Sequence, residues 1–309
     1  MNDSLVKRQK DSIALNLKRF DAFRELGFTT DKIYSENYDK ETGAHLIYPI
    51  KESRSITRSL AWPVVKNSES TFSKINDLIK NILLRYPQFR KKLRELLEGD
   101  FHHASPLLVL MNYLIEQKQP IIGIDVKLAT TNKRPDLEIK LDDQIVFVEA
   151  IAPLFTSEKL ENQLKYKRAD RGMSRILEEK LEKKEADKLD APLILLIWGF
   201  NSRRTPQDVI EAFKQDFSLK PKLSAVLLYG YDRNDFLQFA YKENKQYRFD
   251  EDKLYLIPRK SFLIENPLAE RPLTPKQKQI LTRHNRTVRS IGIKLENIWL
   301  EIKRQIKQL

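Results

Sequence analysis

Residues 134–151 read RPDLEIKLDDQIVFVEAI, and this stretch decides how the centre of the chain folds. Apolar and polar residues alternate over residues 135–141, which is the period of a strand with one buried face. Residues 144–152 are predicted as a second strand, and Asp142-Asp143 as the two-residue turn between the strands. The stretch therefore predicts a β-hairpin.

The predicted hairpin sets its two outermost acids opposite each other. A two-residue turn pairs Leu137 with Val148, and the next pair outward is Asp136 with Glu149. Directly opposed residues share a face with Cβ atoms about 5 Å apart, so two carboxylates there repel unless a positive charge lies between them. A divalent cation supplies that charge, since Mg²⁺ favours oxygen ligands and takes one or two carboxylates. The sequence therefore predicts a site for Mg²⁺ or Mn²⁺ at Asp136 and Glu149.

Glu149 is also unusual within its own strand. Its neighbours on the same face are Phe147 and Ile151, so a carboxylate between them is costly unless it is paired or bound to a metal. Two plainer interpretations stay open. Glu149 could lie beyond the cover of the sheet or pair with a lysine, and Asp136 could merely cap a strand.

The pair Pro135-Asp136, followed after twelve residues by Glu149-Ala150-Ile151, resembles the P-D-x(n)-(D/E)-x-K signature of the PD-(D/E)XK nuclease superfamily. The resemblance covers roughly residues 101–229 and implies a restriction-endonuclease-like core. It implies that the two acids bind the metal and that a lysine assists the attacking water. Members of this superfamily are mostly restriction, repair or transposition nucleases.

The lysine position of the signature holds Ile151, which cannot orient water or offset charge at a phosphate. The resemblance implies that the lysine comes from the following helix or that catalysis is lost. Lys180 is the first candidate, because a helix over residues 173–189 places it beside the apolar stripe, and Lys165 is the second. The acid that the family carries on the preceding helix has a weak counterpart in Glu116, which we expect to be exposed near a helix end.

Outward from the hairpin, the pattern is that of an α/β core. Residues 192–198 and 223–229 are continuous apolar runs, which predict strands buried on both faces. Helices expected over residues 173–189 and 206–217 precede these runs and predict parallel crossovers. With a strand over residues 121–128 before the hairpin, we expect a restriction-endonuclease-like mixed sheet flanked by helices.

The rest of the chain is predicted to be mostly helical. We expect a helical N-terminal region (1–100), the α/β core (101–270) and a basic C-terminal helical tail (271–309). The finer expectations are helices over 11–26 and 71–97, the latter broken at Pro87; an extended or irregular stretch over 47–65; a helix beginning at Pro106; further strands over 236–241 and 254–257; and a terminal helix over 276–309.

Composition excludes several classes of site. The chain has no cysteine, which excludes thiol catalysis and cysteine-bound zinc. Its four histidines include no pair four residues apart. Its eight glycines form neither G-x-G-x-x-G nor G-x-x-x-x-G-K-[ST], so no dinucleotide or P-loop site is expected.

Charge points to a polyanionic partner. The formal net charge is +13, and the basic excess lies on the flanks, at +5 over residues 51–100 and +7 over residues 251–309, whereas residues 101–150 carry −2. Lysine and arginine on the flanks would bind a phosphate backbone, and the acids between them would bind a cation. Ordinary solvated helix faces would give the same excess of positive charge. The longest apolar run, residues 191–200, is too short to span a bilayer, so we expect a cytoplasmic protein with no membrane partner.

These observations lead to one expected function and two alternatives. We expect a Mg²⁺-dependent endonuclease that hydrolyses phosphodiester bonds, in DNA rather than RNA, with Asp136, Glu149 and Lys180 as its catalytic residues. One alternative is a nuclease-like module that binds nucleic acid without cleaving it, which Ile151 favours. The other is a scaffold whose helical ends bind protein partners. The sequence leaves the oligomeric state and the sequence specificity open.

Overall fold

The computed structural model describes residues 3–46, 55–61, 66–128, 133–151, 172–198, 206–215, 218–229 and 261–282, with backbone alone for 66–71 and 102. These residues form two compact units that divide after Glu116. Two expected strands (236–241 and 254–257) and most of the expected terminal helix lie outside the described residues, as does Lys165. Within the described ranges, no helix is long and apolar enough to cross a membrane.

The first unit is helical. Its elements are α1 (Asp3–Arg19), α2 (Asp21–Glu25), α3 (Thr30–Asn37), α4 (Ile56–Ala61), α5 (Lys66–Arg85), the 3-10 turn η1 (Pro87–Phe89), α6 (Arg90–Gly99) and α7 (Phe101–Glu116). The predicted break at Pro87 is confirmed, because α5 ends two residues before it and α6 begins three residues after it. The division after Glu116 places α7 in this unit, where it packs on α5 and α6, whereas the sequence analysis grouped it with the core.

Two local predictions in this unit are wrong. The stretch over residues 47–65 was expected to be extended or irregular, but α4 is helical, with Ile56 and Leu60 buried one turn apart. Six residues are too few for a helical period to show in the sequence. Pro106 was expected to begin its helix, but α7 begins at Phe101. Pro106 instead lies inside the helix, where it has no N–H to donate and so removes one backbone hydrogen bond.

The second unit is built on a six-stranded mixed sheet. Its strands are β1 (Ile121–Ile124), β2 (Leu137–Leu141), β3 (Gln144–Ile151), β4 (Leu193–Trp198), β5 (Ala225–Tyr229) and β6 (Ser261–Glu265), in the spatial order β1-β2-β3-β4-β5-β6. β3, β4 and β5 run parallel, and the other neighbours are antiparallel. The predicted α/β sheet with parallel crossovers is therefore confirmed. β6 was not predicted, because its three buried residues are too few to show a period.

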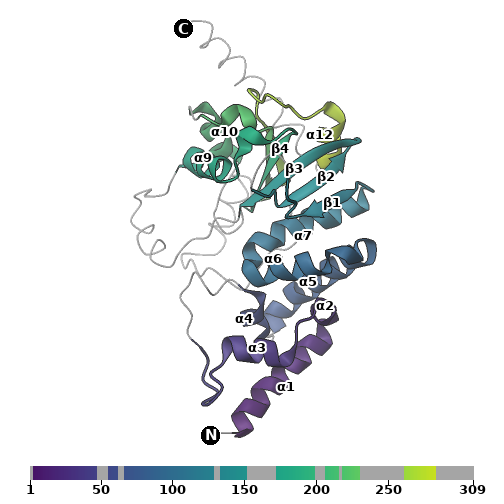
Figure 1. The fold of residues 1–309 in the computed structure, drawn as a ribbon, viewed down its shortest axis with the longest axis vertical. Coiled ribbons are helices and arrows are strands. Elements are labelled where there is room, and N and C mark those ends of the chain that lie inside the picture. The colour runs from purple at the N-terminus through teal and green to yellow at the C-terminus, as the bar shows by residue number, and fades with distance from the viewer. Residues whose placement is uncertain are drawn as a thin grey trace, which may run out of the picture. The chain divides into compact units, whose positions relative to one another are not determined.

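Two helices cover one face of this sheet. They are α9 (Met173–Lys183), which precedes β4, and α10 (Pro206–Lys214), which precedes β5. Figure 1 shows them together, in green, on the same side of the strands. They share one apolar core with alternate residues of the strands, including Phe147 of β3 and Leu195 of β4. Every residue of β4 and β5 is buried, as the apolar runs predict.

A last described helix, α12 (Pro275–Thr282), braces the hairpin of β2 and β3. Its fully buried Gln277 donates from Nε2 to the Leu141 carbonyl at 3.3 Å and to Gln144 Oε1 at 3.2 Å. These two acceptors belong to the residues on either side of the turn. The bonds hold the closed end of the hairpin and so help to fix its register.

Candidate active site

The hairpin forms with the predicted register. Asp142 and Asp143 have φ angles of 51° and 62°, the left-handed values that a two-residue type I′ turn requires at both positions. The strands then pair from Leu141 with Gln144 out to Leu137 with Val148. The next residues outward are Asp136 and Glu149, so the two acids meet at the open end of the hairpin.

Hydrogen bonds between the strands fix both carboxylates. The backbone N–H of Asp136 donates to Glu149 Oε1 at 3.2 Å, and the N–H of Ala150 donates to Asp136 Oδ2 at 2.7 Å. The carbonyl of Asp136 in turn accepts from the N–H of Asp125 at 3.1 Å, on the side of β1. Each acid side chain therefore bonds to the backbone of the other strand, which holds the carboxylates in place without a metal.

Helix α9 brings two lysines to this acid pair. Met173, Leu177 and Leu181 are buried at four-residue spacing against the sheet. Lys180 and Lys184 are also four residues apart and follow the side of this stripe that faces the hairpin. Lys180 Nζ lies 3.0 Å from Glu149 Oε2 and 3.8 Å from Asp136 Oδ2.

The second lysine contacts the acids more evenly. Lys184 Nζ lies 3.0 Å from Glu149 Oε2 and 3.3 Å from Asp136 Oδ1. It also donates to the Arg134 carbonyl at 2.8 Å. The four charged side chains are 1% (Glu149), 14% (Asp136), 17% (Lys180) and 19% (Lys184) exposed, so water screens their interactions poorly.

The electrostatics of the cluster are dominated by Glu149. Burial raises the pKa of its carboxyl, the charge of Asp136 raises it further, and the two ammonium groups only partly offset these effects, so the pKa is about 7. At Lys184, burial lowers the pKa, but the two carboxylates outweigh burial and raise it above its usual value. Lys184 is therefore a cation at neutral pH, whereas the Glu149 carboxyl holds its proton to a higher pH than an ordinary glutamate does.

The oxygens present suit a hard divalent cation. Among the described residues, Glu149 Oε2 is a buried carboxylate oxygen to which no hydrogen-bond donor is aligned, although both ammonium groups form ion pairs with it. An oxygen in that state, opposite a second carboxylate, is the type of ligand that Mg²⁺ and Mn²⁺ prefer. The two ammonium groups already balance the two carboxylates, so a cation that binds here must compete with a lysine.

Of the three other residues considered for the site, the structure describes two. Ile151 is the last residue of β3 and is half-buried. Glu116 ends α7 in the other unit and is exposed, as expected. The second candidate lysine, Lys165, lies outside the described residues.

Sequence analysis missed Lys184 as a member of the cluster. The signal was present in the spacing, because Lys184 is four residues after Lys180 and residues four apart on a helix share a side. The carbonyl of Arg134 could not have been found in this way, since no sequence pattern reports which backbone carbonyl a lysine reaches.

Comparisons with known proteins identify no relative. No protein-family model matches the chain, and no curated protein or solved structure is significantly similar to it. In the part of the chain that the structure describes, no group of three or more His, Cys, Asp or Glu residues is placed to hold a metal ion. The features that bear on function are therefore the acid pair and the lysine pair themselves.

Proposed function

We propose that this protein is a metal-dependent nuclease that hydrolyses phosphodiester bonds in DNA. The observation that supports this proposal is the meeting of four charged side chains at one end of the hairpin, where Asp136 and Glu149 are opposed and Lys180 and Lys184 contact both acids. The pair of acids and the nearby lysine are the chemical components that the PD-(D/E)XK resemblance implies, with the lysine supplied by α9 in place of Ile151.

The residues of the cluster suit different tasks. Asp136 and Glu149 would hold Mg²⁺ or Mn²⁺ through carboxylate oxygens, with the Ala150 carbonyl as a further ligand. When bound, such an ion polarises a phosphoryl oxygen and lowers the pKa of a water molecule. Lys180 Nζ lies closer to Glu149 than to Asp136, at 3.0 Å against 3.8 Å, and its positive charge would stabilise the negative charge that develops at the phosphate during hydrolysis.

The surroundings of the acid pair suit a phosphate backbone. The residues that lead from β1 to β2 include three exposed cations, Lys127, Lys133 and Arg134, and Arg134 is two residues from Asp136. Exposed lysine and arginine side chains neutralise phosphates and release counterions, which favours association with nucleic acid. The net charge of +13 acts in the same direction over a longer range.

A second candidate function has one specific observation in its favour. The two lysines balance the charge of the two acids without any metal, which is also what a nuclease-like module that only binds nucleic acid would need. Ile151 at the lysine position of the signature favours the same alternative. The two candidates differ in a single measurable property, which is cleavage.

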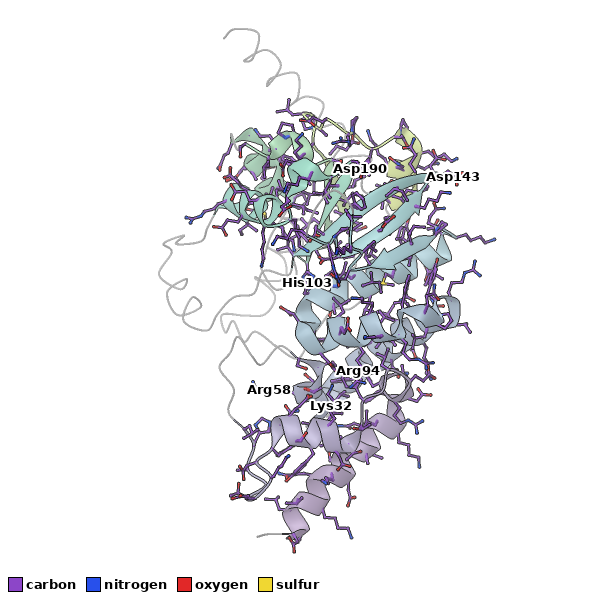
Figure 2. The ribbon with its side chains drawn as sticks, in the orientation of Figure 1. Lys32, Arg58, Arg94, His103, Asp143 and Asp190 are labelled. Carbon is purple, nitrogen blue, oxygen red and sulfur yellow. The ribbon has the colours of Figure 1, made fainter. Side chains whose placement is uncertain are left out.

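The test is a cleavage assay with supercoiled plasmid, linear duplex and single-stranded DNA, in Mg²⁺, in Mn²⁺ and in EDTA. We expect cleavage by the wild type that depends on the metal and that Asp136→Asn abolishes. Asp143→Asn is the matched control, because it removes the same charge from the exposed turn of the same hairpin. Asp143 is labelled in Figure 2, and its positive φ is one that asparagine tolerates.

Two results would contradict the proposal. Equal cleavage by Asp136→Asn and by the wild type would assign the activity to another site or to a contaminant. Absence of cleavage under every metal condition, together with DNA binding that weakens with salt, would establish the binding module instead.

A further inference from the structure

We infer that Lys184 is an internal counterion that occupies the cation position between Asp136 and Glu149, and that it must withdraw before a divalent metal ion can bind there. The inference rests on the proposed function for its choice of metal. It adds a property that the two acids and Lys180 do not imply, namely that this chain limits its own metal affinity.

The Lys184 ammonium lies between the two carboxylates. It lies 3.0 Å from Glu149 and 3.3 Å from Asp136, which makes it a bridge between the two carboxylates. A metal ion that these acids share would take the same position between them. Two cations cannot occupy that position together, because like charges at such short range and low exposure repel strongly.

Lys180, in contrast to Lys184, does not bridge the two acids. Lys180 is equally close to Glu149, at 3.0 Å, but its nearest distance to Asp136 is 3.8 Å, so it lies to one side of the pair. Lys180 can therefore remain beside Glu149 when a metal ion binds, whereas Lys184 cannot remain between the acids. The two lysines thus have different consequences for metal affinity although they are four residues apart on one helix.

Lys184 is also able to leave its position between the acids. It directly follows the last residue of α9, and its side chain is 19% exposed, so its four-carbon stem can carry the ammonium into water. Its departure would free the carbonyl of Arg134, an exposed residue that water can reach. The cost of withdrawal is therefore the loss of the two ion pairs, which a divalent cation on the same oxygens replaces.

The experiment measures Mn²⁺ binding to the full-length chain by electron paramagnetic resonance of the free ion, with Mg²⁺ as competitor. Lys184→Met removes the ammonium, and Lys184→Gln removes the charge but keeps a donor for the Arg134 carbonyl. Both should bind Mn²⁺ at least about tenfold more tightly than the wild type, because the competing charge is gone. Lys180→Met should show a smaller gain.

Two control variants separate this role from a structural one. Lys184→Arg keeps the charge and should leave Mn²⁺ affinity near the wild-type value. Lys183→Met removes an exposed lysine from the same turn of α9 and should also leave Mn²⁺ affinity near the wild-type value. Without metal, Lys184→Met should unfold at a lower temperature than the wild type, and Mn²⁺ should restore more of its stability than it adds to the wild type.

The outcomes distinguish this inference from the proposed function. Unchanged or weaker Mn²⁺ affinity in both Lys184→Met and Lys184→Gln overturns the inference, even if the wild type cleaves DNA. If Lys184→Met fails to fold, Lys184→Gln alone decides in the same way. Tighter Mn²⁺ binding by these variants, lost again when Asp136→Asn is added, supports the inference even if no variant cleaves, and in that case the nuclease function fails on its own.

Discussion

Replacing Glu149 by glutamine should change how the stability of the protein depends on pH. The Glu149 carboxyl has a pKa of about 7 in the folded chain, against an ordinary value of 4.5. The folded state therefore binds a proton over a range in which the unfolded chain has released it. A group of this kind contributes stability that is fully present below pH 4.5 and is lost as the pH rises through 7.

The magnitude follows from the size of the shift. A difference of one pKa unit corresponds to about 1.4 kcal/mol, so a rise from 4.5 to about 7 removes roughly 3 kcal/mol of stability between acid and mildly basic pH. A glutamine side chain resembles the protonated carboxyl in size and polarity and does not titrate. The Glu149→Gln variant should therefore match the wild type near pH 4.5 and exceed its free energy of unfolding by up to about 3 kcal/mol at pH 8.

The assay is urea unfolding followed by circular dichroism, in EDTA, at several pH values from 5 to 8. The informative quantity is the difference between Glu149→Gln and the wild type, because groups that titrate equally in both proteins cancel. Asp143→Asn serves as the matched control, since it removes the same charge from an exposed position of the same hairpin. A Glu149→Gln difference that is constant from pH 5 to 8, or that falls as the pH rises, would refute the argument.

Three further predictions concern catalysis and binding. Glu149→Gln and Asp136→Asn should each abolish metal-dependent cleavage while the circular dichroism spectrum stays native; full activity in either variant would mean that the site is wrongly assigned. Lys180→Met should lower the single-turnover cleavage rate at least about tenfold with DNA affinity unchanged in anisotropy titrations, the effect expected of a group that assists proton transfer, whereas Lys183→Met should cleave normally. Affinity for DNA should fall linearly with the logarithm of salt concentration, with a slope of several units for a footprint of several phosphates, and affinity independent of salt would exclude a phosphate-binding surface.

Much of the candidate site could be predicted because it depends on local periodicity. Alternation in β2 and a two-residue turn determine the register of the hairpin, and the register alone places Asp136 opposite Glu149. The helical period of α9 likewise places Lys180 beside the apolar stripe that packs on the sheet.

The helical period could not distinguish Lys180 from Lys184, because both lie on the same side of α9. Lys180 and Lys184 are equivalent by period, yet their nearest distances to Asp136 are 3.8 Å and 3.3 Å. The role of Lys184 as a bridge is therefore a tertiary property. It depends on how helix α9 packs against the hairpin.

The parts of the fold that were missed share a physical reason. α4 and β6 are short, so each shows too few buried positions for a period to be read. The placement of α7 in the first unit depends on packing against α5 and α6, and a helix's own sequence does not report which neighbour covers it. In each case, tertiary contacts decide what the local pattern leaves open.

The most direct test of the account is a crystal structure of the protein soaked in Mn²⁺, with the ion located by its anomalous scattering. The account predicts a peak bound to carboxylate oxygens of both Asp136 and Glu149, with the ammonium of Lys184 displaced from its position between them and that of Lys180 still beside Glu149. The absence of a peak at the acid pair at saturating Mn²⁺, with both lysines still in contact with the carboxylates, would contradict it.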